Sequence, residues 1–526
     1  MSIELNANAK GIGKPLTHFW NFCVGAGRAN EGLRANWLEH MGKVRNDCGF
    51  RYVRFHGLFH DDMFVYWVKD GQESFNFQYI DDLFDRLLEM GVRPFVELGF
   101  CPKDLATQTN TEFWWQANAS PPKDYGKWAE LVTRTLTHWI ERYGADEVRQ
   151  WYFEIWNEPN LWPFFTGTRK QYFELYKVTA IAIKSLDRQL RVGGPATSSF
   201  VADGRFDGET EDRLQHEVIN KAEDLDALDW KPPWLEEFLT FCHEEQLPVD
   251  FVSCHPYPTD WALDGHGVVK QRMRSVNSTR QDLALVKKIV EAGPYPKAEI
   301  HLTEWSSSPS SRDFMHDYTP AATFVVKANL ESIGLVDSLA YWTFTDVFEE
   351  HGAGNSIFHG GFGMINFQGI VKPTFHAYRM LGSLGDELLA STTGGVVTRH
   401  KQTGKITALL YHYPEEVKTA APSSFKTRNI AEATLKIGSS DQCQLIISGL
   451  QADTTWEIQT LGIGSGDAIT AWRDMGMPEP PSREQTRELK TLAESLRQEI
   501  AHANANGELQ LNLSLNPWDV VLVQQL

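Results

Sequence analysis

The sequence predicts an α/β protein in which a closed (β/α)₈ barrel, the TIM-barrel architecture, precedes an antiparallel β-sandwich. Short apolar runs alternate with longer amphipathic segments up to about residue 384. Beyond that point apolar residues recur at every second position between turn signals, which is typical of paired strands. With 526 residues the chain is long enough for more than one domain.

Eight apolar runs are expected to form the barrel strands, and each is followed by a segment with helical periodicity. The strands are expected at residues 19–24, 52–55, 93–98, 151–156, 191–194, 249–254, 300–304 and 339–344. The helices are expected at residues 36–48, 80–90, 127–143, 169–186, 233–245, 279–292, 320–333 and 374–384. An open doubly wound sheet is the alternative, but no GxGxxG motif follows any of these strands.

The remaining residues, 385–526, are expected to form the β-sandwich. Its strands are expected at 396–400, 406–413, 433–437, 444–448, 455–461, 509–515 and 520–523, with a loop at 419–426. One inserted helix is expected near 482–503, because Ser482 and Gln485 form a capping box before an apolar stripe of Leu489, Leu492, Leu496 and Ile500. The stripe should pack on its own domain, and a subunit contact is the alternative.

Charge and cysteine content limit the function classes. A formal net charge of -19 repels phosphate backbones and argues against a nucleic-acid partner. The six cysteines are scattered without zinc-like spacing, as in proteins of a reduced compartment, and no run is long and apolar enough for a membrane span. The N-terminal residues lack the pattern of a signal peptide, so we expect a cytoplasmic protein, either a monomer or a homo-oligomer.

The stretch WYFEIWNEPN, residues 151–160, carries the first candidate catalytic residue. Pro159 stops the strand, so Glu158 should project at its carboxyl end, where Trp156 and Trp162 are apolar neighbours that raise a carboxyl pKa. Glu158 is therefore expected to be a general acid/base. Glu154 should lie deeper and pair with an arginine such as Arg54. Asn157 can reach the same site only if the strand end is irregular.

The second candidate is Glu304, at the end of the strand EIHLTEW. His301, Thr303, the following serines and Arg54 are expected to keep it ionised, as a nucleophile must be. Two carboxylates at the mouth of a barrel, one protonated and one charged, are what glycoside hydrolysis requires. A separation of roughly 5 Å between them would indicate retention of configuration.

Other polar residues follow the same strand ends. Tyr257 is expected to bond the nucleophile, Trp342 to form the floor under a sugar ring, and Asn157 to bond the hydroxyl next to the reacting carbon. The remaining candidates for contacts with substrate hydroxyls are His56, His255, Glu349 and Glu350. Each has a structural alternative: a turn amide, a core histidine, plain packing or a solvated acidic loop. No metal-ligand spacing or cofactor motif is present, so no metal and no cofactor are expected.

Taken together, the motifs resemble those of glycoside hydrolase family 39, the β-xylosidase and α-L-iduronidase family. The stretches HFWNFCVGAGRA, YVRFHGLFHDD, WYFEIWNEPN, VSCHPYP, HLTEWSSSP and YWTFTDVFEEHG occur in the family's order between residues 15 and 380. The resemblance implies that an N-terminal strand in 1–13 joins the sandwich and that 14–384 form the barrel. It implies Glu158 as acid/base and Glu304 as nucleophile. It also implies that the sugar subsite is lined by His56, Asn157, Tyr257, Trp342, Glu349 and Glu350.

The expected activity is that of a retaining exo-β-D-xylosidase acting on short xylo-oligosaccharides derived from xylan. The acidic pair Glu349 and Glu350 should repel a uronate, which argues against an iduronidase. An arabinosidase or a dual-specificity pentosidase is the nearest alternative, because arabinopyranose and xylose differ at one hydroxyl. A catalytically silent sugar-binding barrel is the alternative from another class.

Overall fold

Eight parallel strands close into a barrel, in the chain order that the sequence predicts. The computed structural model describes residues 3–202, 218–417 and 427–526, so the loop expected at 419–426 lies outside the described residues. The barrel strands are β3 (Cys23–Arg28), β4 (Tyr52–His56), β7 (Arg93–Leu98), β10 (Tyr152–Ile155), β11 (Arg191–Ser198), β12 (Phe251–His255), β15 (Glu299–Trp305) and β16 (Ser338–Tyr341). The predicted fold class is confirmed.

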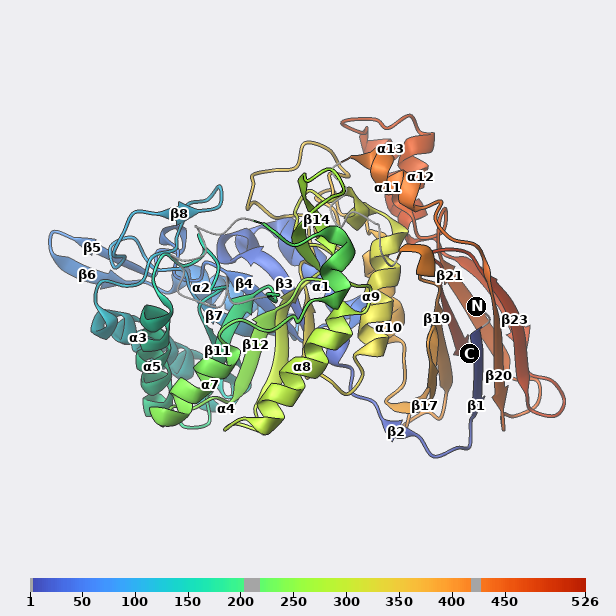
Figure 1. Cartoon of the computed structure of the whole chain (residues 1–526), viewed down its shortest axis with the longest axis horizontal. Helices are drawn as coiled ribbons and strands as arrows, with labels where there is room; N and C mark the ends of the chain where they lie inside the picture. Colours follow the sequence, from blue (N-terminus) through green and yellow to red (C-terminus); the bar gives the residue numbers. More distant parts are fainter. Residues whose placement is uncertain (1–2, 203–217, 418–426) are drawn as a thin grey trace.

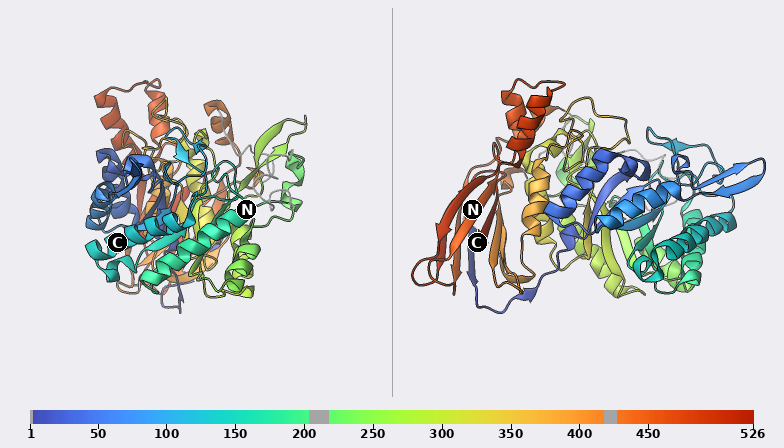
Figure 2. Two further views of the ribbon diagram at one scale, coloured as in Figure 1. Left: turned by 90° about the vertical axis from the view of Figure 1, so that its left-hand side faces the viewer. Right: turned by 180° about the vertical axis from the view of Figure 1, so that it is seen from behind.

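Helices cover the outside of the barrel in all three views (Figures 1 and 2). They are α1 (Ala35–Cys48), α2 (Gln78–Glu89), α3 (Tyr125–Tyr143) with the short α4 (Ala145–Val148), α5 (Arg169–Leu186), α7 (Leu235–Glu244), α8 (Ser278–Ala292), α9 (Thr319–Glu331) and α10 (Pro373–Gly382). In the described part of the chain, none of the helices combines the length and apolarity needed to cross a membrane.

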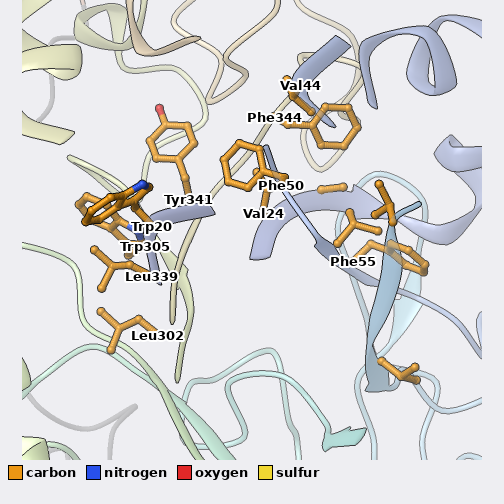
Figure 3. Packing of buried hydrophobic residues seen from close by; sticks show 14 of the residues in the cluster. Trp20, Val24, Val44, Phe50, Phe55, Leu302, Trp305, Leu339, Tyr341 and Phe344 are labelled. Carbon is orange, nitrogen blue, oxygen red and sulfur yellow. The ribbon is translucent and has the colours of Figure 1, made fainter. Parts of the chain in front are cut away.

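The apolar core lies between the barrel wall and the helices, where side chains of neighbouring strands meet. Trp305 and Tyr341, from β15 and β16, lie close to Trp20 of the short 3₁₀ turn Phe19–Asn21, and all three are buried (Figure 3). The predicted first strand, 19–24, is therefore misplaced. Trp20 packs on the outside of the barrel, and β3 begins only at Cys23.

Small residues in β3 make room for the floor of the barrel mouth. A Cβ atom on Gly25 would lie 2.5 Å from Cε3 of Trp342, so only glycine allows the indole to lie against this strand. The glycine at position 25 of β3 is thus a consequence of the position of Trp342. That position is at the carboxyl end of β16, where the predicted substrate site lies.

Short antiparallel hairpins extend from the strand ends of the barrel. They are formed by β5 (Tyr66–Lys69) with β6 (Gln72–Phe75), β8 (Thr111–Glu112) with β9 (Ala117–Asn118), and β13 (Thr259–Leu263) with β14 (Val269–Met273). None of the three was predicted from the sequence. The β13–β14 hairpin follows β12, so it stands beside the barrel mouth.

Two sheets form the second part of the molecule, on the right of Figure 1. One sheet has the order β1 (Ile3–Asn8), β20 (Asp441–Ser448), β23 (Leu509–Leu515). The other has the order β2 (Lys14–Pro15), β17 (Glu387–Thr392), β18 (Gly395–Arg399), β19 (Ile406–Tyr411), β24 (Val520–Gln525), β21 (Thr455–Leu461), β22 (Arg497–His502). Their inward residues form a second core that includes Leu5, Leu445 and Trp456.

The N-terminal strand β1 pairs in parallel with β20, from Ile3 opposite Cys443 to Asn8 opposite Ser448, and the chain then runs back to the barrel (Figure 1). The sandwich is thus antiparallel apart from this one pair among the described strands of its two sheets. The domain limits 1–13, 14–384 and 385–526 stay a prediction. The limit at 384 falls between the end of α10 and the start of β17.

Two predictions for the sandwich are wrong. The strand expected at 433–437 is replaced by helix α11 (Arg428–Thr434), which Thr427 caps by accepting the amide of Ile430. The helix expected at 482–503 is shorter, because α13 (Arg483–Glu494) ends before β22, which adds to the edge of β21. Ile500 belongs to that strand and is exposed, whereas Leu489 packs against α12 (Ala468–Asp474) and its surroundings.

Candidate active site

The chain leaves β10 in a strained conformation that brings two adjacent side chains to the barrel mouth. β10 ends at Ile155, and the next residues include Trp156 with φ of 70° and Glu158 with φ of 46°. Left-handed backbone is uncommon away from glycine and costs roughly 1–3 kcal/mol at each residue. The Glu158 amide is held by the carbonyl of Ala196, at 2.9 Å. The predicted irregular strand end is confirmed, and Asn157 and Glu158 both line one cavity.

Arg54 of β4 lies at the centre of the barrel mouth and is fully buried. Its Nε donates to Glu154 Oε2 at 2.6 Å, which confirms the predicted ion pair. One terminal nitrogen lies 2.8 Å from Asn157 Oδ1 and 3.0 Å from Glu97 Oε2. The other lies 3.4 Å from Glu304 Oε2. A single guanidinium therefore connects residues of β4, β7, β10 and β15.

Glu158 is almost completely buried and lies against His255 of β12. Oε1 of Glu158 is 3.0 Å from Nδ1 of His255. Burial raises the pKa of Glu158 to about 7, against the opposing effects of a hydrogen bond with Ser198 and of the positive charge of Arg54. Near neutral pH this carboxyl group can therefore hold a proton and donate it, as the sequence predicts for a general acid.

Glu304 is better stabilised as an anion than Glu158, because two hydrogen-bond donors point at its carboxylate. The hydroxyl of Tyr257 donates to Oε1 at 2.8 Å, and Arg54 approaches Oε2. Burial and the neighbouring Glu158 nevertheless raise the pKa of Glu304. Since Arg54 and Tyr257 favour the charged form of Glu304, we assign the negative charge to Glu304 and the proton to Glu158.

Two of the donors that the sequence suggested for Glu304 point elsewhere. Thr303 donates to Glu154 Oε1 at 2.7 Å. His301 bonds Ser338 at 2.7 Å and Glu299 at 3.0 Å, at the start of the strand and away from the barrel mouth. The hydroxyl of Thr303 is taken up by Glu154 and His255, and His301 lies at the other end of β15, so neither side chain reaches Glu304.

The two candidate carboxylates are close enough to act on one sugar. An oxygen of Glu158, an oxygen of Glu304 and Nδ1 of His255 all lie within 4.8 Å of one another. Carboxyl groups of retaining glycosidases are about 5–5.5 Å apart, whereas those of inverting enzymes are about 6.5–9.5 Å apart. The observed spacing leaves no room for a water molecule between one carboxylate and the sugar carbon, so it fits direct attack by that carboxylate.

The same three groups could in principle surround a metal ion. His255 Nδ1 is already bonded to Glu158, however, and Glu304 already accepts from Tyr257. A metal would have to displace both hydrogen bonds and place a second cation beside Arg54. The donor set therefore suits proton transfer better than metal binding.

A cavity of about 730 Å³ opens above the pair. Seven of the predicted site residues line it: His56, Asn157, Glu158, Tyr257, Glu304, Trp342 and Glu350. Its outer part is formed by residues that the sequence analysis did not single out, among them Phe113, Phe164, Trp261 and Arg312. These residues belong to loops and hairpins whose path the strand pattern does not predict.

Two predicted substrate-binding residues do not line the cavity. His255 is fully buried behind Glu158. Glu349 forms ion pairs with Arg28 at 3.1 Å and Arg34 at 2.6 Å, and these lower its pKa against the effect of its partial burial. Of the acidic pair, only Glu350 faces the cavity.

Glu350 has an unusual environment for a carboxyl group. Burial and repulsion by Glu304 raise its pKa well above the usual range. A protonated Glu350 can both donate to and accept from a sugar hydroxyl. Because Glu349 is paired and Glu350 is held neutral, the charge repulsion expected against a uronate is weaker than the sequence suggested.

Glu97 of β7 is a site residue that the sequence analysis missed. It accepts from Arg54 and lies 2.6 Å from Nδ1 of His56, which holds that ring at the cavity wall. The signal was present, since Glu97 is the one charged residue in the apolar run PFVEL at the carboxyl end of a barrel strand. Strand ends in this fold carry chemistry, and a charge there is informative.

A parallel barrel whose mouth brings two buried carboxyl groups this close together is characteristic of retaining glycoside hydrolases. The model of Glycosyl hydrolases family 39 matches residues 1–207 and 225–510, so the chain belongs to this family and is a glycosidase.

Full-length relatives support the family assignment. The chain is 35% identical to a β-xylosidase of Caldicellulosiruptor saccharolyticus over 99% of this chain and 98% of that protein. It is 35% identical to a β-xylosidase of Geobacillus stearothermophilus over 96% and 92%, respectively. The crystal structure of a monomeric β-xylosidase from Caulobacter crescentus CB15 superimposes with a TM-score of 0.85 at 30% identity, covering 100% of this chain and 99% of the other.

Replacing Arg54 with methionine should strongly destabilise the protein. The substitution removes the cation and leaves Glu97, Glu154 and Glu304 buried together, and breaking a buried ion pair in this way costs about 3–5 kcal/mol. Urea unfolding would measure the change in the free energy of unfolding.

The matched control is Arg134→Met, because Arg134 pairs with Glu130 on the exposed face of α3. Loss of an exposed pair of this kind costs about 0–1 kcal/mol. Equal and small changes for the two variants would contradict the central role of Arg54.

Proposed function

We propose that the protein is a retaining exo-β-D-xylosidase that releases xylose from the non-reducing end of short β-xylo-oligosaccharides. The observation that carries this proposal is the pair Glu158 and Glu304, whose carboxylate oxygens lie within 4.8 Å of each other at the barrel mouth. The choice of xylose is supported by the two full-length relatives, both of which are β-xylosidases.

In the first step Glu304 attacks the anomeric carbon while Glu158 donates its proton to the departing oxygen. Arg54 and Tyr257 fix the orientation of Glu304, so the attacking oxygen is held in place before substrate arrives. The product is a glycosyl ester of Glu304.

In the second step Glu158, now ionised, takes a proton from water, and the oxygen of that water attacks the anomeric carbon. The ester bond to Glu304 breaks, and the sugar leaves with its original configuration. Glu158 ends the cycle protonated, so no net proton is gained or lost.

The aromatic residues in one wall of the cavity support removal of a terminal sugar. Trp342 and Phe362 line the cavity and pack with Phe348 in a small separate apolar cluster. An aromatic wall at this position would close the cavity beyond one sugar ring. On this proposal His56, Asn157 and Glu350 bond the hydroxyls of that ring.

We also place the protein in the cytoplasm and leave open whether it acts as a monomer or an oligomer. The support is the state of its six cysteines, which are all free and buried. Short oligosaccharides would then be cleaved after import into the cell.

A panel of nitrophenyl glycosides tests the substrate. The β-D-xylopyranoside should be hydrolysed with the highest kcat/KM, ahead of the α-L-arabinopyranoside, the α-L-arabinofuranoside and an α-L-iduronide. A preference for either arabinoside would make the enzyme an arabinosidase, and no turnover of any glycoside would favour a sugar-binding barrel.

Replacing Glu158 with alanine should have an effect that depends on the leaving group. Xylosides with poor leaving groups should lose roughly 10²–10⁴-fold in rate, the usual contribution of general acid catalysis, whereas dinitrophenyl xyloside should still form the ester quickly. Azide should rescue turnover of the activated substrate by attacking the ester and yielding β-xylosyl azide.

Asp82→Ala is a suitable control, because Asp82 is an exposed residue of α2 that pairs with Arg86. It should leave the dependence on leaving group unchanged. An equal loss for all substrates in the Glu158 variant, without azide rescue, would exclude Glu158 as the acid/base.

A further inference from the structure

His255 is a predicted substrate-binding residue that lies behind Glu158 and does not line the cavity. Its ring is fully buried, and both ring nitrogens have partners. Nδ1 lies 3.0 Å from Glu158 Oε1, and Nε2 lies 2.9 Å from the hydroxyl oxygen of Thr303. His255 therefore connects the acid/base to β15 without facing the substrate.

The direction of the hydrogen bond at Thr303 can be assigned from its second partner. The Thr303 hydroxyl lies 2.7 Å from Glu154 Oε1, and the other oxygen of Glu154 accepts from Arg54. A carboxylate in an ion pair can only accept, so the single hydroxyl hydrogen of Thr303 points to Glu154. The lone pairs of Thr303 then face Nε2 of His255, and Nε2 must carry the hydrogen.

This assignment also determines whether Nδ1, on the other side of the ring, carries a hydrogen. Burial lowers the pKa of His255 to about 4, so the ring is neutral near pH 7 and carries one hydrogen. With that hydrogen on Nε2, Nδ1 presents a lone pair to Glu158. Only a protonated Glu158 can complete the hydrogen bond, because an ionised carboxylate would face the lone pair with one of its own.

We propose that Thr303 and Glu154 hold His255 in the tautomer whose Nδ1 accepts a hydrogen bond, which makes His255 a positioning residue that keeps the catalytic proton on Glu158. The proposal rests on the proposed function, in which Glu158 is the acid/base. In the resting enzyme Nδ1 accepts a hydrogen bond from the protonated carboxyl group of Glu158. When substrate binds, the glycosidic oxygen takes the place of Nδ1 as acceptor, and the O–H bond of Glu158 breaks as the leaving group gains the proton.

The same arrangement assists the second step. Once Glu158 is ionised, the lone pair on Nδ1 opposes its charge and makes the carboxylate a stronger base toward water. Removal of a proton from water restores the hydrogen bond to His255. The neutral ring of His255 therefore favours the protonated form of Glu158 before the first step. It also favours the recovery of that form in the second step.

Other charged groups also face this pair, and they must stay unchanged in any test. They are Arg54 and His56 on β4, Glu97 on β7, Glu154 on β10, Glu304 on β15, and Glu350 beyond β16. Ser198 on β11 and Tyr257 after β12 add hydroxyl groups. A variant at Thr303 that lacks the hydroxyl keeps all of these side chains and removes two hydrogen bonds, the one from Nε2 of His255 and the one that Glu154 accepts.

The experiment compares Thr303→Val with Thr303→Ser. Glu158 must be protonated for the first step, so kcat/KM falls as the pH rises through its pKa, about 7 in the original protein. Without the Thr303 hydroxyl, the ring can place its hydrogen on Nδ1 and donate to ionised Glu158, which lowers that pKa. The alkaline limb of kcat/KM should move down by roughly one pH unit in Thr303→Val, because a hydrogen bond to the charged form favours it.

Serine retains the hydroxyl, so Thr303→Ser should keep the alkaline limb at the pH of the original protein. A purely structural role of Thr303 would lower the rate at every pH without moving the limb. An unmoved limb in Thr303→Val, a limb moved upward, or equal shifts in both variants would overturn the proposal.

A second measurement does not depend on activity. Long-range ¹H–¹⁵N correlation spectra of the histidine rings in the original protein report the tautomer, and His255→Gln identifies the His255 signals. Hydrogen on Nε2 supports the proposal, and hydrogen on Nδ1 overturns it even if Thr303→Val fails to fold. If the original protein hydrolyses no glycoside of the panel, the proposed function fails while the tautomer result still decides the state of His255.

Discussion

The ion pair between Arg54 and Glu154 is the interaction on which the site depends. Both side chains are fully buried in the barrel mouth, where a charge is stable only with partners. From Arg54 one path reaches Glu304 directly. From Glu154 a second path runs through Thr303 and His255 to Glu158. One buried cation therefore organises a charged carboxylate and a protonated carboxylate at the same time. This division of charge is what a retaining glycosidase needs before substrate arrives.

The barrel makes such a network possible because eight parallel strands bring their carboxyl ends to one rim. The network draws on β4, β7, β10, β12 and β15, which are spread over most of the chain. The strained backbone after β10 adds a second condition, because Asn157 and Glu158 can both reach the cavity only with left-handed residues on either side of Asn157. The apolar core between the barrel wall and the helices, part of which Figure 3 shows, holds the strands that carry these residues.

Much of this could be predicted from the sequence, and the failures have physical reasons. Apolar runs that end in Glu158 and Glu304 predict buried strands with a carboxylate at the barrel mouth. A carboxylate is rarely buried within a strand, so the strand end is the expected place for it. Distances across the barrel do not follow from spacing along the chain. His255 and Glu349 therefore looked like substrate ligands, although one lies behind Glu158 and the other is paired with Arg28 and Arg34. In the sandwich, the helical pattern of apolar residues continues to Ile500. The segment that contains Ile500 nevertheless forms β22, because it pairs with β21.

The central claim is that Glu304 carries the charge that attacks the sugar while Glu158 holds the proton. Incubation with 2,4-dinitrophenyl 2-deoxy-2-fluoro-β-D-xyloside tests it most directly, because fluorine slows both steps and the good leaving group still permits the first. Mass spectrometry of the intact protein and of its peptides should show one fluoroxylosyl group per chain, attached to Glu304. A label on another carboxylate, or turnover that releases α-xylose first without any label, would contradict the account.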